Sequence, residues 1–330
     1  MNMKTIFIAA TLSFGLSLPA LAQDVRWDMA NEYNENSTHG IGQLVFSETL
    51  SETTDGAIEI TNHFGGSIGY KSREHFDAVA DGALPIANTS MGQVAGIEPL
   101  FLLSSLPFLV KDAEEARLLW EVGKPYYEDV FAANNQVLLY ASPWTPAGIW
   151  ANAPETSLED IAGLKIRTWD ASGTRTLQEA GAAPIQLSWA DVVPQLATGG
   201  IDAVMTSADG GASAKFWEQL SHFSAINYSM SLNMTHINKD AWDGLSDEQR
   251  DAVLVAAEAA SDAAWAALDT RVTENYAEMT SNGMTIIEDV PAEFLDALNE
   301  AGQSVYTDWL DKVGPVGQEI LDEYAARRGS

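Results

Sequence analysis

GLKIRTWDASGTRTLQEAGAAPIQLSWADVVPQLATGGIDAVMTS, residues 163–207, alternates short apolar runs with longer amphipathic segments. The runs have the length of β-strands, and the segments between them have the apolar spacing of helices. The expected strands are 163–169, 183–187 and 201–207, and the expected helices are 172–181 and 189–198. Strands that alternate with helices in this way indicate a parallel sheet with helical crossovers. This stretch therefore predicts an α/β fold.

The first of these strands contains an arginine, Arg167, at a position that looks buried. Leu164, Ile166 and Trp169 are the residues expected to face inward. A guanidinium keeps its proton in proteins, so removing it from water is costly unless an anion compensates its charge. The nearest carboxylate along the chain is Asp170. Either another part of the fold or a bound ligand is therefore expected to supply the anion.

The same alternation begins near the N-terminus. Strands are expected over 25–30, 57–64, 83–90 and 136–144, and helices over 41–53 and 72–81. The chain thus contains two α/β blocks of comparable size, each with a mostly parallel sheet. The first break between the blocks falls near 144–152.

The longest expected element is a helix over 246–281. Ser246 is a good N-cap, and Gln249 stands at the reciprocal position of a capping box. The segment is free of Gly and Pro and is followed by Asn282-Gly283, a common helix stop. At about 1.5 Å per residue this helix would reach roughly 50 Å, which is long enough to lie across both blocks. Two further amphipathic helices follow it.

Residues 1–22 have the layout of a secretory signal peptide. A basic start at Lys4 precedes an apolar run over 6–18, and Ala20-Leu21-Ala22 is a small-residue cleavage site. The apolar run is shorter than the ~20 residues that span a bilayer. We therefore expect cleavage after Ala22 and export to the periplasm. No later stretch favours stable membrane insertion, and the absence of Cys excludes disulfides and thiol chemistry.

The formal net charge of −30 restricts the partners of this chain. The 47 acidic residues are spread along the sequence and outnumber the 17 Lys and Arg residues. Such a surface repels nucleic acid and anionic lipid, so we expect neither as a partner. An anionic ligand would need a local positive site, which makes each Arg and Lys informative.

No enzyme motif is present in the sequence. The Gly-x-Ser-x-Gly, P-loop and His-Glu-x-x-His motifs are absent, and the five His lack the spacing of a metal site. We therefore predict no catalytic residue, no metal site and no cofactor. An alternative that stays open is an exported enzyme that holds an organic acid on Arg167, with Asp170, Asp191, His222 or His236 as its nucleophile or base.

Several motifs occur together in a family-specific order. They are FGGSIG (64–69), ALPIANTS (83–90), LPFL (106–109), LEDIAGLKIRTW (158–169) and GAAPIQLSWADVVPQLATGGIDAV (181–204). This order resembles the extracytoplasmic solute receptors of tripartite ATP-independent periplasmic (TRAP) transporters, the dicarboxylate-receptor (DctP) family, over essentially the whole mature chain. The resemblance implies a two-lobed α/β periplasmic binding protein with a long helix spanning both lobes. Such a receptor closes on a small organic acid and delivers it to a small and a large membrane subunit.

The resemblance also implies how the chain divides between the lobes. The first lobe is expected over 24–144 plus 232–271 and the second over 145–231 plus 272–330, with the helix over 246–281 shared. A monomer is the default expectation. A receptor for a membrane sensor is a further alternative, because the same closure would serve sensing as well as transport.

The family motifs point to individual ligand-binding residues. Arg167 matches the arginine that pairs with the ligand carboxylate, with which a planar fork forms two parallel charge-assisted hydrogen bonds. An internal ion pair with an Asp or Glu is the alternative. Trp189 matches an aromatic position of the family, and Ser90 and Thr206 match polar ones. The other predicted ligand-binding residues are Asn31 and Glu32, in the first strand–helix loop, and the aromatic residues Trp144 and Trp169.

Departures from the family pattern predict the type of ligand. Ala147 stands where many relatives have a second arginine, Ala190-Asp191-Val192-Val193 replaces Ser-Glu-Val-Tyr, and Asp202-Ala203-Val204-Met205-Thr206 replaces Asp-Gly-Gln-Glu-Asn. The cleft has thus lost a cation and several polar groups, whereas four Trp lie nearby in the sequence. We therefore predict a monocarboxylate with an apolar, ring-bearing or zwitterionic remainder rather than a C4-dicarboxylate.

Overall fold

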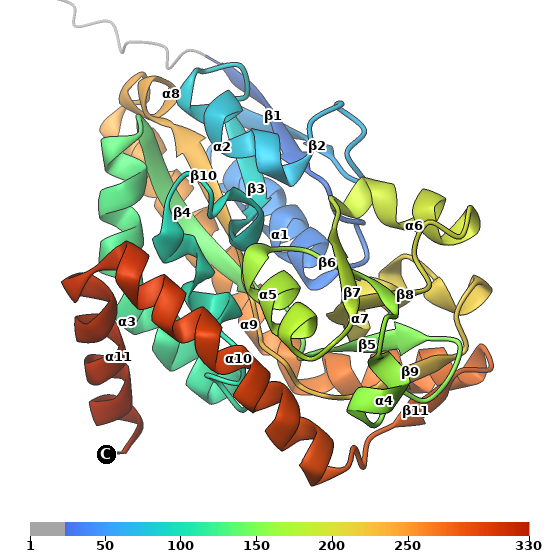
Figure 1. Ribbon diagram of the computed structural model, residues 1–330. Coiled ribbons are helices and arrows are strands. Elements are labelled where there is room, and N and C mark those ends of the chain that lie inside the picture. The colour runs from blue at the N-terminus through green and yellow to red at the C-terminus, as the bar shows by residue number, and fades with distance from the viewer. Residues whose placement is uncertain (1–23, 330) are drawn as a thin grey trace, which may run out of the picture.

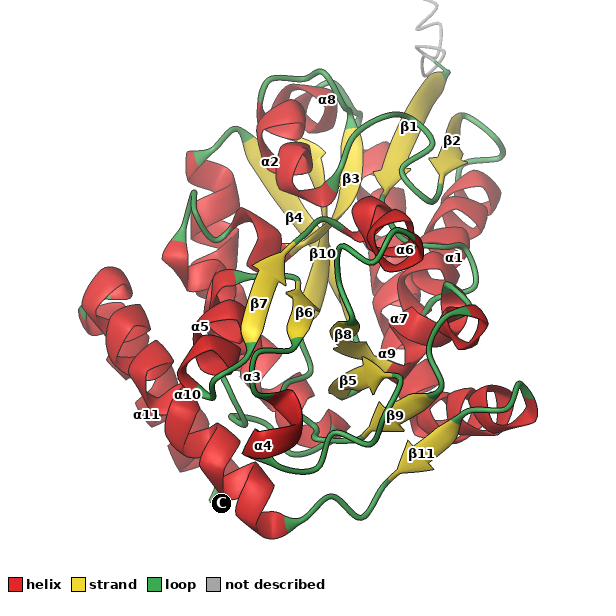
Figure 2. Cartoon of the chain, turned by 45° about the vertical axis from the view of Figure 1, so that its right-hand side comes forward, coloured by secondary structure: helices red, strands yellow, loops and turns green. Residues whose placement is uncertain are grey.

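The computed structural model describes residues 24–329, and the predicted signal peptide (1–22) lies outside these described residues. The strands form two separate sheets, which Figure 2 shows as two groups, one above the other. We call the five-stranded sheet with the helices that pack on it lobe I, and the six-stranded sheet with its helices lobe II. The residue boundaries of the lobes predicted from the sequence stay predictions.

Lobe I is built around a sheet with the strand order β2-β1-β3-β10-β4. Its strands are β1 (Val25–Asn31), β2 (Ile58–His63), β3 (Ile86–Ser90), β4 (Gln136–Pro143) and β10 (Leu232–Asn238). Its helices are α1 (Thr38–Thr53), α2 (Ser72–Ala80), α3 (Ala113–Ala133) and α8 (Lys239–Asp243), with the short 3-10 helices η1 (Met91–Val94) and η2 (Pro99–Ser105). The predicted strand–helix alternation of this half gives the parallel pairs of β1 with β2 and with β3.

Lobe II has the strand order β11-β9-β5-β8-β6-β7. Its strands are β5 (Ala147–Ala151), β6 (Lys165–Thr168), β7 (Ala183–Gln186), β8 (Ala203–Ser207), β9 (His222–Ser224) and β11 (Thr285–Ile287). Its helices are α4 (Leu158–Ile161), α5 (Ala171–Glu179), α6 (Trp189–Ala197) and α7 (Ala208–Ser213), with the 3-10 helix η3 (Phe216–Glu218). β6 pairs in parallel with β7 and β8, so the strands and crossover helices predicted over 163–207 are confirmed.

The expectation of mostly parallel sheets is confirmed, although one strand in each sheet runs against all the others. β10 lies between β3 and β4 and runs antiparallel to both. β5 lies between β8 and β9 and is likewise antiparallel to both. Each of these two strands follows a direct link from the other lobe instead of a crossover helix. β5 and β10 therefore both begin at the junction of the lobes, where β3, β4, β6 and β8 end.

Two links between the lobes lie side by side at this junction. The first joins β4 to β5 and the second joins β9 to β10. The backbone N–H of Trp144 donates to the Ser231 carbonyl at 2.9 Å, and that of Ala147 donates to the Ser229 carbonyl at 3.0 Å. The links are thus hydrogen-bonded to each other, which places residues from both of them in the space between the lobes.

The predicted long helix is confirmed as α9 (Asp247–Ser281). Ser246 and Gln249 form the expected capping box, with the Ser246 side chain accepting from the Gln249 N–H and the Gln249 side chain accepting from the Ser246 N–H. α9 packs on α1 and β4 of lobe I and on α7 and β11 of lobe II, and Figure 1 shows it running behind both sheets. α10 (Ala292–Val313) crosses from α5 to η2, and α11 (Pro315–Arg328) packs on α3.

Each lobe has an apolar core, and the core of lobe II extends across the junction to Tyr33 and Trp144. One large cluster in lobe I is centred on buried aromatic residues such as Phe101 and Phe131, and one in lobe II on Trp150 and Phe223. The aromatic residues between the lobes are therefore part of a packed cluster. No helix within residues 24–329 combines the length and the apolarity needed to cross a bilayer.

Candidate ligand-binding site

A small cavity lies between the lobes, at the junction where the parallel strands end. It is lined from both sides. The lining residues are Tyr33, Ser90, Trp144, Thr145, Ala147, Arg167, Trp169, Trp189, Thr206, Ser207 and Ser231. In open α/β folds, ligands usually bind in the crevice outside the carboxyl ends of the strands. Six of the eight residues predicted to bind ligand are brought together here, and their ligand contacts stay predictions.

Arg167 is the one cationic residue of the lining. It lies on β6 and is 1% exposed. Its Nε donates to the Leu187 carbonyl at 3.0 Å, whereas its Nη2 is buried without a hydrogen-bond partner. Within residues 24–329 it forms no direct ion pair, and the buried carboxylates of Glu32 and Asp170 act on it only from a distance. Burial lowers the pKa of this guanidinium from its usual value, against raising by Tyr33, Glu32 and Asp170.

Aromatic rings from both lobes form one wall of the cavity. The Arg167 Cζ lies 5.5 Å from the centroid of the Trp189 ring, a cation–π distance. Tyr33 packs between Trp189, with ring centroids 5.5 Å apart, and Trp144, with ring centroids 4.7 Å apart. The Trp144 Nε1–H donates to Asn233 Oδ1 at 2.9 Å, which fixes that ring. A flat, uncharged group bound near Arg167 would therefore meet aromatic surface.

Hydroxyl groups supply the remaining polar surface of the cavity. Ser90 ends β3, and Thr206 lies near the end of β8, so each reaches the cavity from a different lobe. The Tyr33 Oη accepts from the Gln93 Nε2 at 3.2 Å. Burial and then the nearby Glu32 raise the pKa of Tyr33 to about 12, so its hydroxyl stays a hydrogen-bond donor. These groups can pair with the neutral oxygens and N–H groups of a ligand.

Asn31 and Glu32 lie beside the cavity but are not part of its lining. The Asn31 side chain donates to Gln43 Oε1 at 2.9 Å and accepts from the Tyr33 N–H at 2.8 Å, so it shapes the loop after β1. The Glu32 carboxylate is engaged by backbone N–H groups. The predicted ligand contacts of both residues stay predictions.

Tyr33 was missed by sequence reasoning, although it lines the cavity. It follows Asn31 and Glu32 directly, in the same loop after β1. The signal was available in the residue type, because Tyr combines a large apolar ring with a hydroxyl that seeks a partner. The loop was recognised as a route to the cleft, but the sequence does not state which of three adjacent side chains turns inward.

The candidate bases of the enzyme alternative do not line the cavity. His236 is buried in β10, where it contacts Gln136 and Thr89, and burial lowers its pKa to about 3. His222 lies on β9 beside Ser221, and Asp191 pairs with Lys71. Among residues 24–329 there is no cluster of three or more His, Cys, Asp or Glu that could hold a metal ion.

Asp170, the remaining candidate, is buried behind the cavity at the start of α5. Its Oδ1 accepts from the Gly173 N–H at 2.9 Å as an N-cap, and its Oδ2 is buried without a hydrogen-bond partner. Burial raises the pKa of this carboxyl to about 6, against lowering by the Gly173 hydrogen bond and by Arg167. The folded chain therefore binds a proton here more tightly than the unfolded chain does.

This raised pKa predicts a pH dependence of stability. As pH rises from about 4 to about 6, the folded state loses the advantage of its protonated Asp170, so the free energy of unfolding should fall. At about 1.4 kcal/mol per pKa unit, Asp170 should account for about 3 kcal/mol of this fall, since its pKa moves from 3.8 to about 6. Asp170→Asn keeps a good N-cap and should remove that part of the slope.

Urea unfolding of wild type and variant across this pH range measures the effect. Asp112→Asn is the matched control, because Asp112 is an exposed N-cap whose Oδ1 accepts from the Glu115 N–H at 2.9 Å. In this control, the free energy of unfolding should depend on pH as it does in the wild type. Equal slopes for wild type and Asp170→Asn would contradict the prediction.

Comparison with known proteins gives a consistent result over nearly the whole chain. Residues 29–312 match the model of the family "bacterial extracellular solute-binding protein, family 7" (DctP). A TRAP solute binding protein from a marine metagenome, solved with co-purified pyroglutamate and described as specific for it, is 33% identical, with a TM-score of 0.88 over 92% of this chain and 99% of that chain. DctP7 of Bordetella pertussis, a receptor that binds pyroglutamic acid, is 27% identical, with a TM-score of 0.88 over 91% of this chain and 99% of that chain.

A curated relative agrees with these structures. The C4-dicarboxylate-binding periplasmic protein DctP of Rhodobacter capsulatus is 25% identical over 98% of this chain and 93% of its own length. The family consists of periplasmic transport receptors for small organic acids that work with TRAP membrane subunits, and it is not an enzyme family. The chain described here, with its two lobes, its shared long helix and its single cavity arginine, belongs to the DctP family of bacterial extracellular solute-binding proteins, the solute receptors of TRAP transporters.

Proposed function

We propose that this TRAP receptor captures a monocarboxylate with a small uncharged ring, and that pyroglutamate is the best candidate. The observation that carries the proposal is the buried Arg167 Nη2 without a partner in a cavity whose other lining residues are uncharged. One guanidinium compensates one carboxylate. A second carboxylate would be buried with no cation within the lining, which is costly.

The rest of the lining suits a lactam ring. The rings of Tyr33, Trp144 and Trp189 offer apolar surface to a flat group. The hydroxyls of Ser90 and Thr206 can serve the amide N–H and carbonyl of such a ring. The lining residues are buried and leave little free space between them, which favours a small acid over a sugar acid.

Binding would follow from closure of the lobes. Because Ser90 and Tyr33 belong to lobe I while Arg167 and Trp189 belong to lobe II, only the closed form contacts a ligand from both sides. A ligand therefore shifts the population toward that form. We propose that the chain is exported by cleavage after Ala22, acts as a monomer, needs no cofactor, and hands an unaltered ligand to its membrane subunits.

Mass spectrometry and calorimetry test this proposal together. The ligand released from purified protein should be an unaltered monocarboxylate, and calorimetry should show that pyroglutamate binds far more tightly than succinate or malate. Proline is the matched comparison, because it has the same ring and carboxylate without the lactam carbonyl and with a charged nitrogen. Tight succinate binding, or chemical turnover of the added acid, would overturn the proposal.

A further inference from the structure

The carboxylate of Glu32 joins the two lobes. Glu32 is 1% exposed and forms no ion pair within the described residues. Its Oε2 accepts from the Ser72 N–H of lobe I at 2.9 Å, and its Oε1 accepts from the Ala190 N–H of lobe II at 3.0 Å. One buried carboxylate thus receives one hydrogen bond from each side of the cleft.

Both donors lie at the start of a helix whose N-cap residue makes no side-chain hydrogen bond to the helix. In α2, Glu74 accepts from the Lys71 N–H at 2.9 Å, which leaves the Ser72 N–H for Glu32. Ser72 is the first residue of α2, whose N-cap residue Lys71 makes no side-chain cap hydrogen bond. Ala190 is the second residue of α6, whose N-cap residue Ser188 makes none either. Free N–H groups and the positive end of the helix dipole stabilise an anion at such a position. Glu32 therefore caps two helices at once, one in each lobe.

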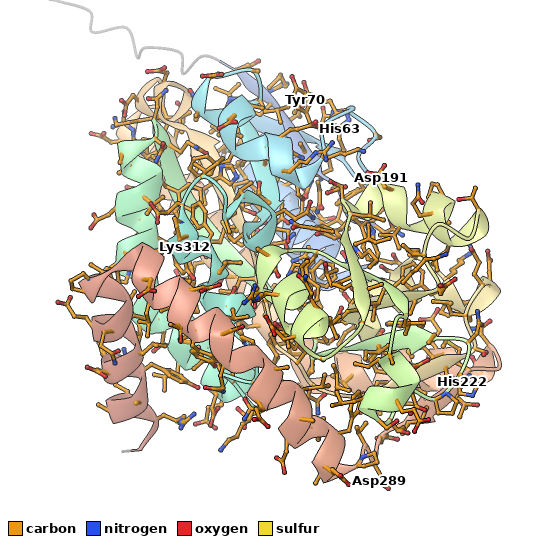
Figure 3. The ribbon with its side chains drawn as sticks, in the orientation of Figure 1. His63, Tyr70, Asp191, His222, Asp289 and Lys312 are labelled. Carbon is orange, nitrogen blue, oxygen red and sulfur yellow. The ribbon has the colours of Figure 1, made fainter. Side chains whose placement is uncertain are left out.

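An ion pair joins the same two helix starts. The Lys71 Nζ lies 2.7 Å from Asp191 Oδ2 and 2.8 Å from Asp191 Oδ1. Asp191 is the third residue of α6, and Figure 3 labels it where this helix faces lobe I. The two side chains are 29% and 39% exposed, so the pair is partly screened by solvent and is weak compared with the buried Glu32 contacts.

The helix held in this way carries Trp189, which lies over the Arg167 guanidinium. Separating the lobes would remove one hydrogen bond from Glu32 and leave the Lys71–Asp191 pair broken. We propose that Glu32 and this ion pair form a clasp that stabilises the closed form, and that Glu32 is a positioning residue that sets ligand affinity without touching the ligand. The inference rests on the proposed function, because the clasp would set how long a bound solute stays enclosed.

The Glu32→Gln variant tests the buried part of the clasp. An amide has one carbonyl oxygen, so it can accept from Ser72 or from Ala190 but not replace both carboxylate oxygens. We expect the ligand dissociation rate to rise roughly tenfold or more with a smaller change in the association rate, because the apparent affinity falls with the closed fraction. Stopped-flow fluorescence with pyroglutamate measures both rates. A purely structural role would lower thermal stability equally with and without ligand and leave the dissociation rate unchanged.

Variants of the ion pair test the exposed part. Lys71→Met and Asp191→Asn should each raise the dissociation rate about two- to fivefold, less so in high salt, as expected for a partly exposed pair. The double exchange Lys71→Asp with Asp191→Lys should restore much of the loss. Lys124→Met is the matched control, since Lys124 pairs at 3.7 Å with Glu128 on the same helix, α3, and it should change nothing.

A second readout separates this inference from the ligand assignment. The chain contains no Cys, so Asp77→Cys on α2 and Ala197→Cys on α6, both exposed, provide the only two thiols for spin labels. The distance between the labels should shift toward longer values in Glu32→Gln and Asp191→Asn, even without ligand. If wild type fails to bind pyroglutamate, this distance still tests the clasp. Unchanged label distances together with unchanged dissociation rates in all clasp variants would overturn it.

Discussion

Arg167→Ala should eliminate most of the ligand affinity while leaving the fold intact. Removing one partner of a buried charge-assisted pair costs about 2–5 kcal/mol, because the ligand carboxylate would be buried without a cation. The free protein should lose less, since Arg167 has no direct ion pair among the described residues and contributes one hydrogen bond to the Leu187 carbonyl and a cation–π contact with Trp189. Calorimetry should therefore show a large loss of affinity, while the unfolding temperature of the unliganded protein changes little.

Arg167→Lys should also weaken binding strongly, because an ammonium keeps the charge but loses the planar fork. Arg175→Ala is the matched control: Arg175 lies on α5 of the same lobe, is exposed, and pairs with Glu179 at 2.9 Å. It should bind ligand as wild type does. If both Arg167 variants also kept full affinity, the ligand carboxylate would have to be held elsewhere.

The local patterns of the sequence predicted most elements of this fold. The alternation of apolar runs with amphipathic segments over 163–207 predicted β6, α5, β7, α6 and β8. The capping box at Ser246 predicted the start of α9. These signals depend on side chains close together along the chain, so they can be read without knowing the tertiary structure. The buried position of Arg167 was predicted in the same way, from apolar neighbours in one strand.

What the sequence did not predict depends on contacts distant along the chain. β10 and β5 pair antiparallel to their neighbours because the chain crosses between the lobes just before each of them. No local sequence pattern indicates in which direction such a strand runs in its sheet. The same holds for Glu32. Its partner Ala190 is 158 residues away, so no local pattern predicts the hydrogen bond between them. Single-residue roles at a junction between lobes require the tertiary structure.

The most direct test of lobe closure is to substitute a glycine at the junction between the lobes. Gly92 in η1 of lobe I faces Asp170 at the start of α5 in lobe II. A Cβ at Gly92 would lie 2.4 Å from Asp170 Oδ2 and 2.9 Å from its Cβ, closer than such atoms approach in proteins. Asp170 cannot easily move, because its Oδ1 caps α5 through the Gly173 N–H. Gly92 has no positive φ, so alanine strains the contact and not the backbone.

Gly92→Ala should therefore oppose closure more than folding. Overpacked contacts typically cost about 1–3 kcal/mol, and this cost applies only when the lobes meet. We expect ligand affinity to fall about five- to 150-fold, while the unfolding temperature of the unliganded protein changes little. Gly96→Ala is the control in the same segment, since a Cβ there meets nothing within 4 Å. A strong loss of unliganded stability with unchanged affinity would mean instead that Gly92 and Asp170 stay packed in every state, and that the lobes move about another contact.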